Sequence, residues 1–170
     1  METAASVSVL DEALIKEAGQ QHFESLSQMV PNLNWAGGTS RPRYFQIRGI
    51  GERSQYEGAP NPSVGFIVDD IDFSALGGVA TLFDVEQIEV LRGPQGTLYG
   101  RNAIGGAINT ISKRPTDDFE IDSVFGIGDY EARKVGVAVS GPVNDWLRYR
   151  AVGFRESRDG IDHNYGAGDE

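Results

Sequence analysis

The chain has 170 residues, a formal net charge of −10 and no cysteine. This length allows one domain with a buried core and a smaller addition. The charge argues against a nucleic-acid partner, which needs clustered lysine and arginine, and the lack of cysteine excludes disulfides and thiolate metal sites. Because the sequence shows neither a signal-peptide pattern nor the run of about 20 apolar residues of a spanning helix, we expect either a soluble protein or a mature or truncated part of one that enters a membrane as β-structure.

The N-terminal quarter predicts one short strand and two short helices. Ser6 to Leu10 alternates as a strand does, and Asp11 can cap a helix that Gly19 ends. A second amphipathic helix is expected from Phe23 to Val30, before a proline. Asn32 to Pro42 contains two glycines, a serine and a threonine and is predicted to be a loop.

The next segment predicts strands separated by turns. Tyr44 to Ile50 reads as a strand, Glu52 to Pro62 as a polar turn region, and Val64 to Phe73 as an apolar strand with an acidic interruption. The acidic residues Asp69, Asp70 and Asp72 could suggest a carboxylate pair or calcium ligands, but the glycine and glutamate of an EF-hand loop are missing, so an acidic turn is favoured. Short strands mixed with short helices predict an α+β domain.

The segment from Val85 to Pro115 combines a glycine-rich stretch with apolar residues such as Leu91 and Ile104. This mixture predicts tight turns that a core holds in place, since glycine permits positive φ and close approach. It is not a phosphate-binding Walker loop, because Gly106 and Ala107 stand where lysine and serine or threonine are required. The glycines expected to be structural are Gly49, Gly93, Gly96, Gly100, Gly105 and Gly106.

After Pro115 the pattern changes to that of amphipathic strands. Phe119 to Ile127 places apolar residues mainly at odd positions, Val135 to Ser140 alternates again, and a third run from Leu147 loses its alternation after Ala151. Such strands are common in soluble sheets, and they are also typical of an outer-membrane barrel wall. The expected turns are Gly128–Asp129 and Gly141–Asp145.

The stretch LRGPQGTLYGRNAIGGAIN closely resembles the C-terminal part of the plug domain of TonB-dependent outer-membrane receptors, and the match extends from Ser6 to Pro115. The resemblance implies an α+β plug domain, with a small mixed sheet and short helices, over residues 1–115. Residues 116–170 would then be about the first three antiparallel strands of an incomplete transmembrane β-barrel, ending in an extracellular loop from Asp159 to Glu170. Three strands cannot close a barrel, which needs at least about eight, so we expect a truncated chain that is not competent alone.

The function that the resemblance implies is energy-coupled uptake of a scarce ligand across the outer membrane of a Gram-negative bacterium. The glycine-rich stretch is similar to that of siderophore receptors, so a ferric siderophore is favoured, while cobalamin, haem and plant-derived compounds stay open. The implied partner is a periplasmic TonB-type protein that pulls on a TonB box upstream of the first strand. Met1 to Ala5 has only a faint likeness to this box, which we expect to be absent. We expect neither an enzyme nor a bound cofactor or metal.

Two sets of site residues are expected. In the family, arginines that match Arg48 and Arg92 pair with glutamates on the inner barrel wall, so here they would lack their partners; local sequence alone also allows both to extend into solvent. The second set is predicted to lie on ligand-facing loops. It comprises Gly37, Gly38, Thr39, Ser40, Arg41, Glu52, Arg53, Gln55 and Tyr56.

Two alternatives stay open at this point. One is a soluble α+β ligand-binding module with a β-hairpin tail, which requires Phe119, Phe125 and Ile127 to be buried. The other is a non-functional receptor remnant.

Overall fold

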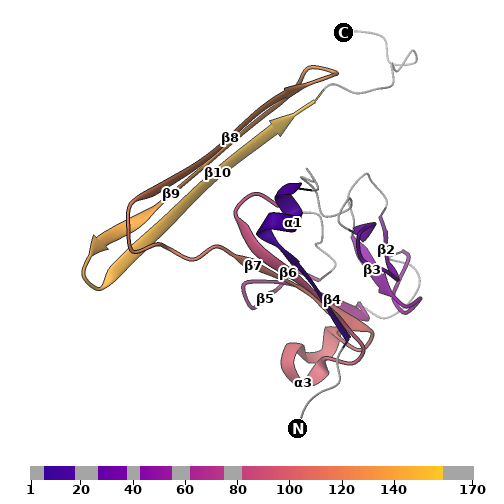
Figure 1. Ribbon diagram of the computed structural model, residues 1–170. Coiled ribbons are helices and arrows are strands. Elements are labelled where there is room, and N and C mark those ends of the chain that lie inside the picture. Colours follow the sequence, from indigo (N-terminus) through magenta and orange to yellow (C-terminus); the bar gives the residue numbers. More distant parts are fainter. Residues whose placement is uncertain (1–5, 18–26, 38–42, 55–61, 75–81, 159–170) are drawn as a thin grey trace, which may run out of the picture. The chain divides into compact units, whose positions relative to one another are not determined.

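The computed structural model describes residues 6–17, 27–37, 43–54, 62–74 and 82–158, and the chain divides into two compact units, Met1–Lys113 and Arg114–Glu170 (Figure 1). Each unit is described by itself below. Within the described ranges, no helix has the length and hydropathy that crossing a membrane requires.

A small mixed sheet of five strands organises the first unit (Figure 1). The strands lie in the order β1-β6-β7-β4-β5, and neighbours are antiparallel except for the parallel pair of β7 and β4. In the described part of this unit, the short helices α1 (Glu12–Glu17) and α3 (Gly96–Tyr99) and the 3-10 helix η1 (Gly100–Asn102) accompany the sheet, which gives the expected α+β domain. The strands are β1 (Ser6–Asp11), β4 (Val64–Val68), β5 (Ile71–Asp72), β6 (Val85–Arg92) and β7 (Gly106–Ser112).

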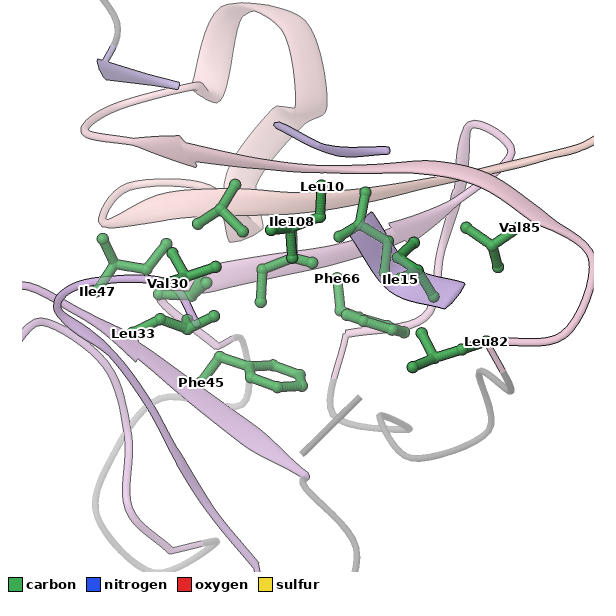
Figure 2. Close-up of a cluster of buried hydrophobic side chains, with 13 residues drawn as sticks. Leu10, Ile15, Val30, Leu33, Phe45, Ile47, Phe66, Leu82, Val85 and Ile108 are labelled. Carbon is green, nitrogen blue, oxygen red and sulfur yellow. The ribbon is translucent and has the colours of Figure 1, made fainter. Parts of the chain in front are cut away.

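The hydrophobic core lies on one face of this sheet, where α1 and a hairpin add side chains (Figure 2). Phe66 in β4, Ile108 in β7 and Val90 in β6 are register neighbours and are almost fully buried. Full burial of an aliphatic or aromatic side chain contributes about 1.5–3 kcal/mol, so this face supplies most of the stability. The cluster comprises Leu10, Ile15, Val30, Leu33, Phe45, Ile47, Val64, Phe66, Leu82, Val85, Ile88, Val90 and Ile108.

The helix α1 begins as predicted. The Leu14 backbone N–H donates to Asp11 Oδ1 over 2.8 Å, the N-cap hydrogen bond that a helix start requires. Ile15 then projects from α1 into the core. Gly19, Phe23 and Leu26, which were expected to end this helix and form the next, lie outside the described residues.

The predicted loop from Asn32 to Pro42 is wrong in its first half. Leu33–Ala36 forms strand β2, which pairs with β3 (Tyr44–Ile47) as an antiparallel hairpin. Leu33 is buried and Trp35 packs against the core, so the four residues alternate between core and solvent. The loop was predicted because Pro31 precedes this short strand and glycines follow it.

The apolar segment from Val64 to Phe73 is two strands rather than one. Asp69 and Asp70 have φ values of 48° and 66° and form the turn between β4 and β5. Two consecutive residues with positive φ are typical of a tight hairpin turn, and aspartate tolerates this conformation better than most residues. Asp69 also accepts a hydrogen bond from the Ser112 N–H over 2.8 Å, which ties the turn to the end of β7.

Three glycines of the glycine-rich stretch have positive φ: 100° at Gly93, 77° at Gly100 and 147° at Gly106. Gly96 does not, and its predicted turn is wrong, because it is the first residue of α3. A different requirement applies at Gly105, where an added Cβ would lie 2.9 Å from Ile50 Cγ2.

The second unit is a three-stranded antiparallel sheet in the order β10-β9-β8 (Figure 1). Its strands are β8 (Glu120–Gly128), β9 (Ala132–Asn144) and β10 (Leu147–Ser157). The first turn follows Gly128 as predicted. The second prediction is wrong, because β9 runs through Asn144 and the chain turns at Asp145 and Trp146, where Asn144 Oδ1 accepts the N–H of Trp146 and of Leu147.

The end of the first unit is tied to its beginning by an ion pair. Lys113, directly after β7, places Nζ 2.7 Å from Oε1 of Glu12, which also pairs with Lys16. Burial alone would raise the pKa of the Glu12 carboxyl, but hydrogen bonds and Coulombic attraction from Lys113 and Lys16 outweigh burial and hold the pKa below its ordinary value of 4.5.

Stability should therefore depend on Glu12 in a pH-dependent way. A depressed folded-state pKa gives stability that is present above the unfolded-state pKa and lost as pH falls through the folded-state pKa. Near neutral pH, Glu12→Gln should lower the free energy of unfolding by up to about 1 kcal/mol, since both ion pairs are partly exposed, and this difference should shrink in acid. Denaturant unfolding at several pH values measures it, with Glu17→Gln in the same helix as control. A loss that persists in acid would contradict the assignment.

Gly106 should be intolerant of any side chain. An added Cβ would lie 2.4 Å from the Leu91 carbonyl oxygen and 2.7 Å from Ile47 Cδ1, so Gly106→Ala should lower the free energy of unfolding by more than about 1 kcal/mol. The control is Gly96→Ala, because nothing lies within 4 Å of a Cβ there and alanine favours the helix. Equal melting temperatures for the two variants would refute the close-approach argument.

Candidate functional site

Arg92 is one of the two arginines expected to pair with glutamates of a barrel wall. Its side chain forms hydrogen bonds within the first unit. Its guanidinium donates to Ser8 Oγ over 2.7 Å, to Ser6 Oγ over 3.3 Å and to the Pro31 carbonyl oxygen over 3.4 Å. Arg92 follows Ile88 and Val90 on the core face of β6, and the two serines share that face in β1. Arg92 thus closes the end of the core and holds the edge strand β1.

The expectation that Arg92 lacks its glutamate partners on a barrel wall stays a prediction, but other groups of the first unit bind the guanidinium here. Among the described residues, the guanidinium donates hydrogen bonds to hydroxyl and carbonyl oxygens rather than to a carboxylate. The alternating serines in SVSVL, which lie on the face of Leu10, were the signal for this arrangement. A contact of Arg92 with a barrel wall stays a prediction.

Arg48 has a different environment. It lies in the turn after β3 with φ of 54°, and its backbone N–H donates to the Asn32 carbonyl oxygen over 2.9 Å. The side chain is exposed and forms no hydrogen bond or ion pair with the described residues. Its guanidinium is available to a carboxylate elsewhere, as the resemblance implies, and this role also stays a prediction.

Glu52, predicted to face a ligand, instead joins two segments of the first unit. Its carboxylate accepts the Ser63 hydroxyl over 2.6 Å and the Ser63 N–H over 2.8 Å. The Ser63 carbonyl oxygen in turn accepts the N–H of Gly105 over 2.8 Å. Both carboxylate oxygens are therefore occupied, and Glu52 positions the start of β4 beside the turn before β7.

Most of the predicted ligand-facing residues lie outside the described residues. Of the set, the structure describes Gly37 and Arg53, which are both exposed, in addition to Glu52. Their role in ligand contact stays a prediction. The residues outside the described ranges are Gly38, Thr39, Ser40, Arg41, Gln55 and Tyr56.

A polar cluster on the sheet face opposite the core was not predicted. Glu89 in β6 accepts hydrogen bonds from Gln87 Nε2 over 2.8 Å and from Asn109 Nδ2 over 3.1 Å. Tyr99 of α3 is half-buried, and burial first, then the negative charges of Glu89 and Asp70, raise the pKa of its hydroxyl. The alternation of Gln87 and Glu89 with apolar residues in β6 was the available signal.

The sheet of the second unit has two unlike faces, which we call the odd face and the even face after the residue numbers on them. The odd face is apolar and exposed: Phe125 is 71% exposed and Ile127 is 94% exposed, and Phe119, just before β8, is 66% exposed. The alternative of a soluble ligand-binding module required these three side chains to be buried. Their exposure disfavours that alternative. Apolar members of the odd face include Ile121, Phe125, Ile127, Val135, Val137 and Val139.

The even face carries charges that are paired with each other. Arg150 Nη2 in β10 lies 3.0 Å from Asp122 Oδ2 in β8, across the small residue Ala138, and the arginine side chain is only 6% exposed. A nearly buried guanidinium needs such a partner. Polar groups on one face and apolar groups on the other are the pattern of a barrel wall strand.

Ser140 fastens the segment that enters this sheet. It is fully buried, and its hydroxyl oxygen accepts the Thr116 N–H and lies within hydrogen-bonding distance of the Thr116 hydroxyl, both at 2.9 Å. The Ser140 hydroxyl also lies 3.2 Å from the Tyr149 carbonyl oxygen, to which it donates. An ion pair between Asp117 and Arg148 adds to this attachment, so the chain enters β8 from a fixed point.

Arg92 should control the mobility of β1. Arg92→Gln removes charged hydrogen bonds to Ser6 and Ser8, so amide hydrogen exchange in Ser6–Asp11 should become several-fold faster while β7 changes little. Arg48→Gln is the matched control, since its side chain makes no contact of this kind. Unchanged exchange in β1 of the Arg92 variant would show that the backbone ladder alone holds the strand.

Comparison with known proteins agrees with this geometry. The model of the TonB-dependent Receptor Plug Domain family matches residues 1–107. The pesticin receptor of Yersinia pestis is 30% identical over 148 residues, which are 86% of this chain and 22% of that receptor. The catecholate siderophore receptor Fiu of Escherichia coli K12 is 31% identical over 152 residues, which are 88% of this chain and 19% of that protein.

A solved structure gives the same result. The crystal structure of the ferric yersiniabactin uptake receptor FyuA from Yersinia pestis superposes with a TM-score of 0.68 and 30% identity, covering 84% of this chain and 22% of that chain. The chain spans about a fifth of the length of these relatives. Since the family model covers more than half of the residues, the chain belongs to the TonB-dependent receptor plug domain family.

Proposed function

We propose that this chain is the plug and the first wall strands of a receptor that imports ferric siderophores across the outer membrane of a Gram-negative bacterium. The observation that carries the proposal is the order of the two units. A plug-type sheet is followed directly by amphipathic antiparallel strands whose apolar odd face is exposed. An exposed apolar surface of this size needs a partner, and lipid suits strands with this alternation.

The ligand class is supported by the relatives. One is named a catecholate siderophore receptor and another a ferric yersiniabactin uptake receptor, and both are about 30% identical to this chain. These ligands differ in chemistry but share a chelated ferric ion. We therefore assign the class of ferric siderophore and leave the individual compound to experiment.

The remainder of the wall is proposed to come from further strands. In the three-stranded sheet, β8 and β10 each have one edge that pairs with no strand among the described residues. Within a bilayer each unpaired backbone group on such an edge costs several kcal/mol, so both edges require pairing before this sheet can lie in lipid. A wall of about 22 strands is usual for plugged transporters of this kind.

Energy coupling follows from how β1 is held. This strand is at the edge of the plug sheet, pairs with β6 over Ser6–Asp11, and is fastened by Arg92. Detaching it breaks several backbone hydrogen bonds and exposes Leu10, which thermal motion alone does rarely. We propose that a TonB-type periplasmic protein supplies this work by pulling on the chain before β1.

The test is transport by the full-length receptor that carries this chain. Expressed in an Escherichia coli strain without its own siderophore receptors, it should take up radioactive iron bound to at least one of a panel of catecholate, phenolate and pyoverdine siderophores. Uptake should disappear in an isogenic strain without TonB. Neither uptake nor binding across the panel would contradict the ferric siderophore assignment, and uptake that persists without TonB would contradict the coupling.

A further inference from the structure

The odd face of the second unit is apolar except at one end, where two arginines interrupt it. Arg133 lies near the start of β9 and Arg155 near the end of β10. Both have odd numbers and share the face of Val135 and Val137. Figure 1 shows that the turn between β8 and β9 and the end of β10 are at the same end of this sheet.

The two arginines are close neighbours on this face. Arg155 is the register partner of Val135, and Arg133 is two residues before Val135, so the arginines are diagonal neighbours across β9 and β10. Diagonal Cβ atoms in antiparallel sheets lie about 7–8 Å apart, within reach of long side chains. Two cations at this spacing repel each other unless an anion lies between them.

The described acidic residues nearest to Arg133 in the chain are Asp129 and Glu131, in the turn between β8 and β9, and of these two Glu131 forms an ion pair with it. Arg133 Nη2 lies 3.7 Å from Glu131 Oε2, and both side chains are more than 70% exposed, so this pair is weak. Arg155 is exposed and forms no hydrogen bond or ion pair with the described residues. Among residues 82–158, the acceptors at this end are therefore fewer than the donors of two guanidinium groups.

The position of the arginines along the strand matches the boundary of a bilayer. The apolar run of β9 from Val135 to Val143 is about 27 Å long at ~3.4 Å per residue. With a strand tilt of about 40°, it spans roughly 20 Å along the membrane normal, close to the ~25 Å apolar band of outer-membrane barrels. An exposed aromatic residue lies in the turn at each end of the sheet: Tyr130 before β9 and Trp146 before β10.

We propose that Arg133 and Arg155 together bind the phosphate group of an anionic lipid in the outer leaflet. The planar guanidinium matches a phosphate with two parallel hydrogen bonds, and two such groups can share one phosphate. Phosphate oxygens replace the weak contact with Glu131 and remove the repulsion between the arginines. The proposal rests on the proposed function in two respects: the odd face must lie in lipid, and the end of β10 must face the outside of the cell, as the family resemblance implies.

The test measures lipid retention by the full-length receptor that carries this chain. The purified receptor is exchanged into vesicles of phosphatidylcholine that contain either lipid A or the same lipid with its phosphates removed, then extracted, and bound lipid is counted by native mass spectrometry. The unmodified receptor should retain several-fold more phosphorylated than dephosphorylated lipid, and Arg133→Gln combined with Arg155→Gln should remove this preference.

Two further variants control for charge and folding. Arg148→Gln changes an arginine that pairs with Asp117 away from the odd face and should keep the preference. Arg133→Lys combined with Arg155→Lys keeps the charge without the planar fork and should keep part of it. All variants are first shown to have the heat-resistant electrophoretic mobility of a folded barrel.

Two outcomes overturn the proposal. One is equal retention of phosphorylated lipid by the unmodified receptor and by the double glutamine variant. The other is displacement of the lipid by inorganic phosphate, which would identify a general anion site in place of a lipid site. Because retention is measured without any iron ligand, its failure leaves the transport proposal intact, and failure of transport leaves the lipid result to be judged separately.

Discussion

The central strand β7 begins at Gly106, where the lack of a side chain lets two backbone segments approach closely. At this point the backbone passes so close to the Leu91 carbonyl oxygen and to Ile47 that even a methyl group would collide. From there β7 pairs with β6 on one side and with β4 on the other, and Ile108 reaches the middle of the core. The pairing of three neighbouring strands therefore passes through the point where β7 begins.

The two units differ in whether the apolar face of their sheet is buried. The first buries the apolar face of its sheet against α1 and the hairpin of β2 and β3. The second pairs its charges on the even face, as Asp122 and Arg150 do, and leaves its apolar face uncovered. Just before Arg114, Lys113 is held by its ion pair with Glu12. Just after Pro115, Thr116 is held by its hydrogen bond to Ser140.

Much of this fold could be predicted from periodicity and from the family resemblance. The strand from Ser6, its helix cap at Asp11 and the amphipathic pattern after Phe119 needed only local alternation. The predicted loop at Leu33–Ala36 was wrong because packing overrides local composition there. These residues form a strand that is held by pairing with β3 and by the core, despite the flanking proline and glycines. The hydrogen bonds from Arg92 to the serine hydroxyls were not predicted, because these serines are more than eighty residues away in sequence. The alternating serines of SVSVL mark one face of β1, but they do not show which residue that face meets.

The central claim is that the chain is a plug followed by wall strands whose odd face contacts lipid. Spin labels placed one at a time at residues 121–127 of the full-length receptor, in a bilayer, test it most directly through their accessibility to oxygen and to a water-soluble nickel chelate. The account predicts alternation with a period of two, in which the odd positions are reached by oxygen and shielded from nickel. Odd positions that are open to nickel, or buried from both reagents, would contradict it.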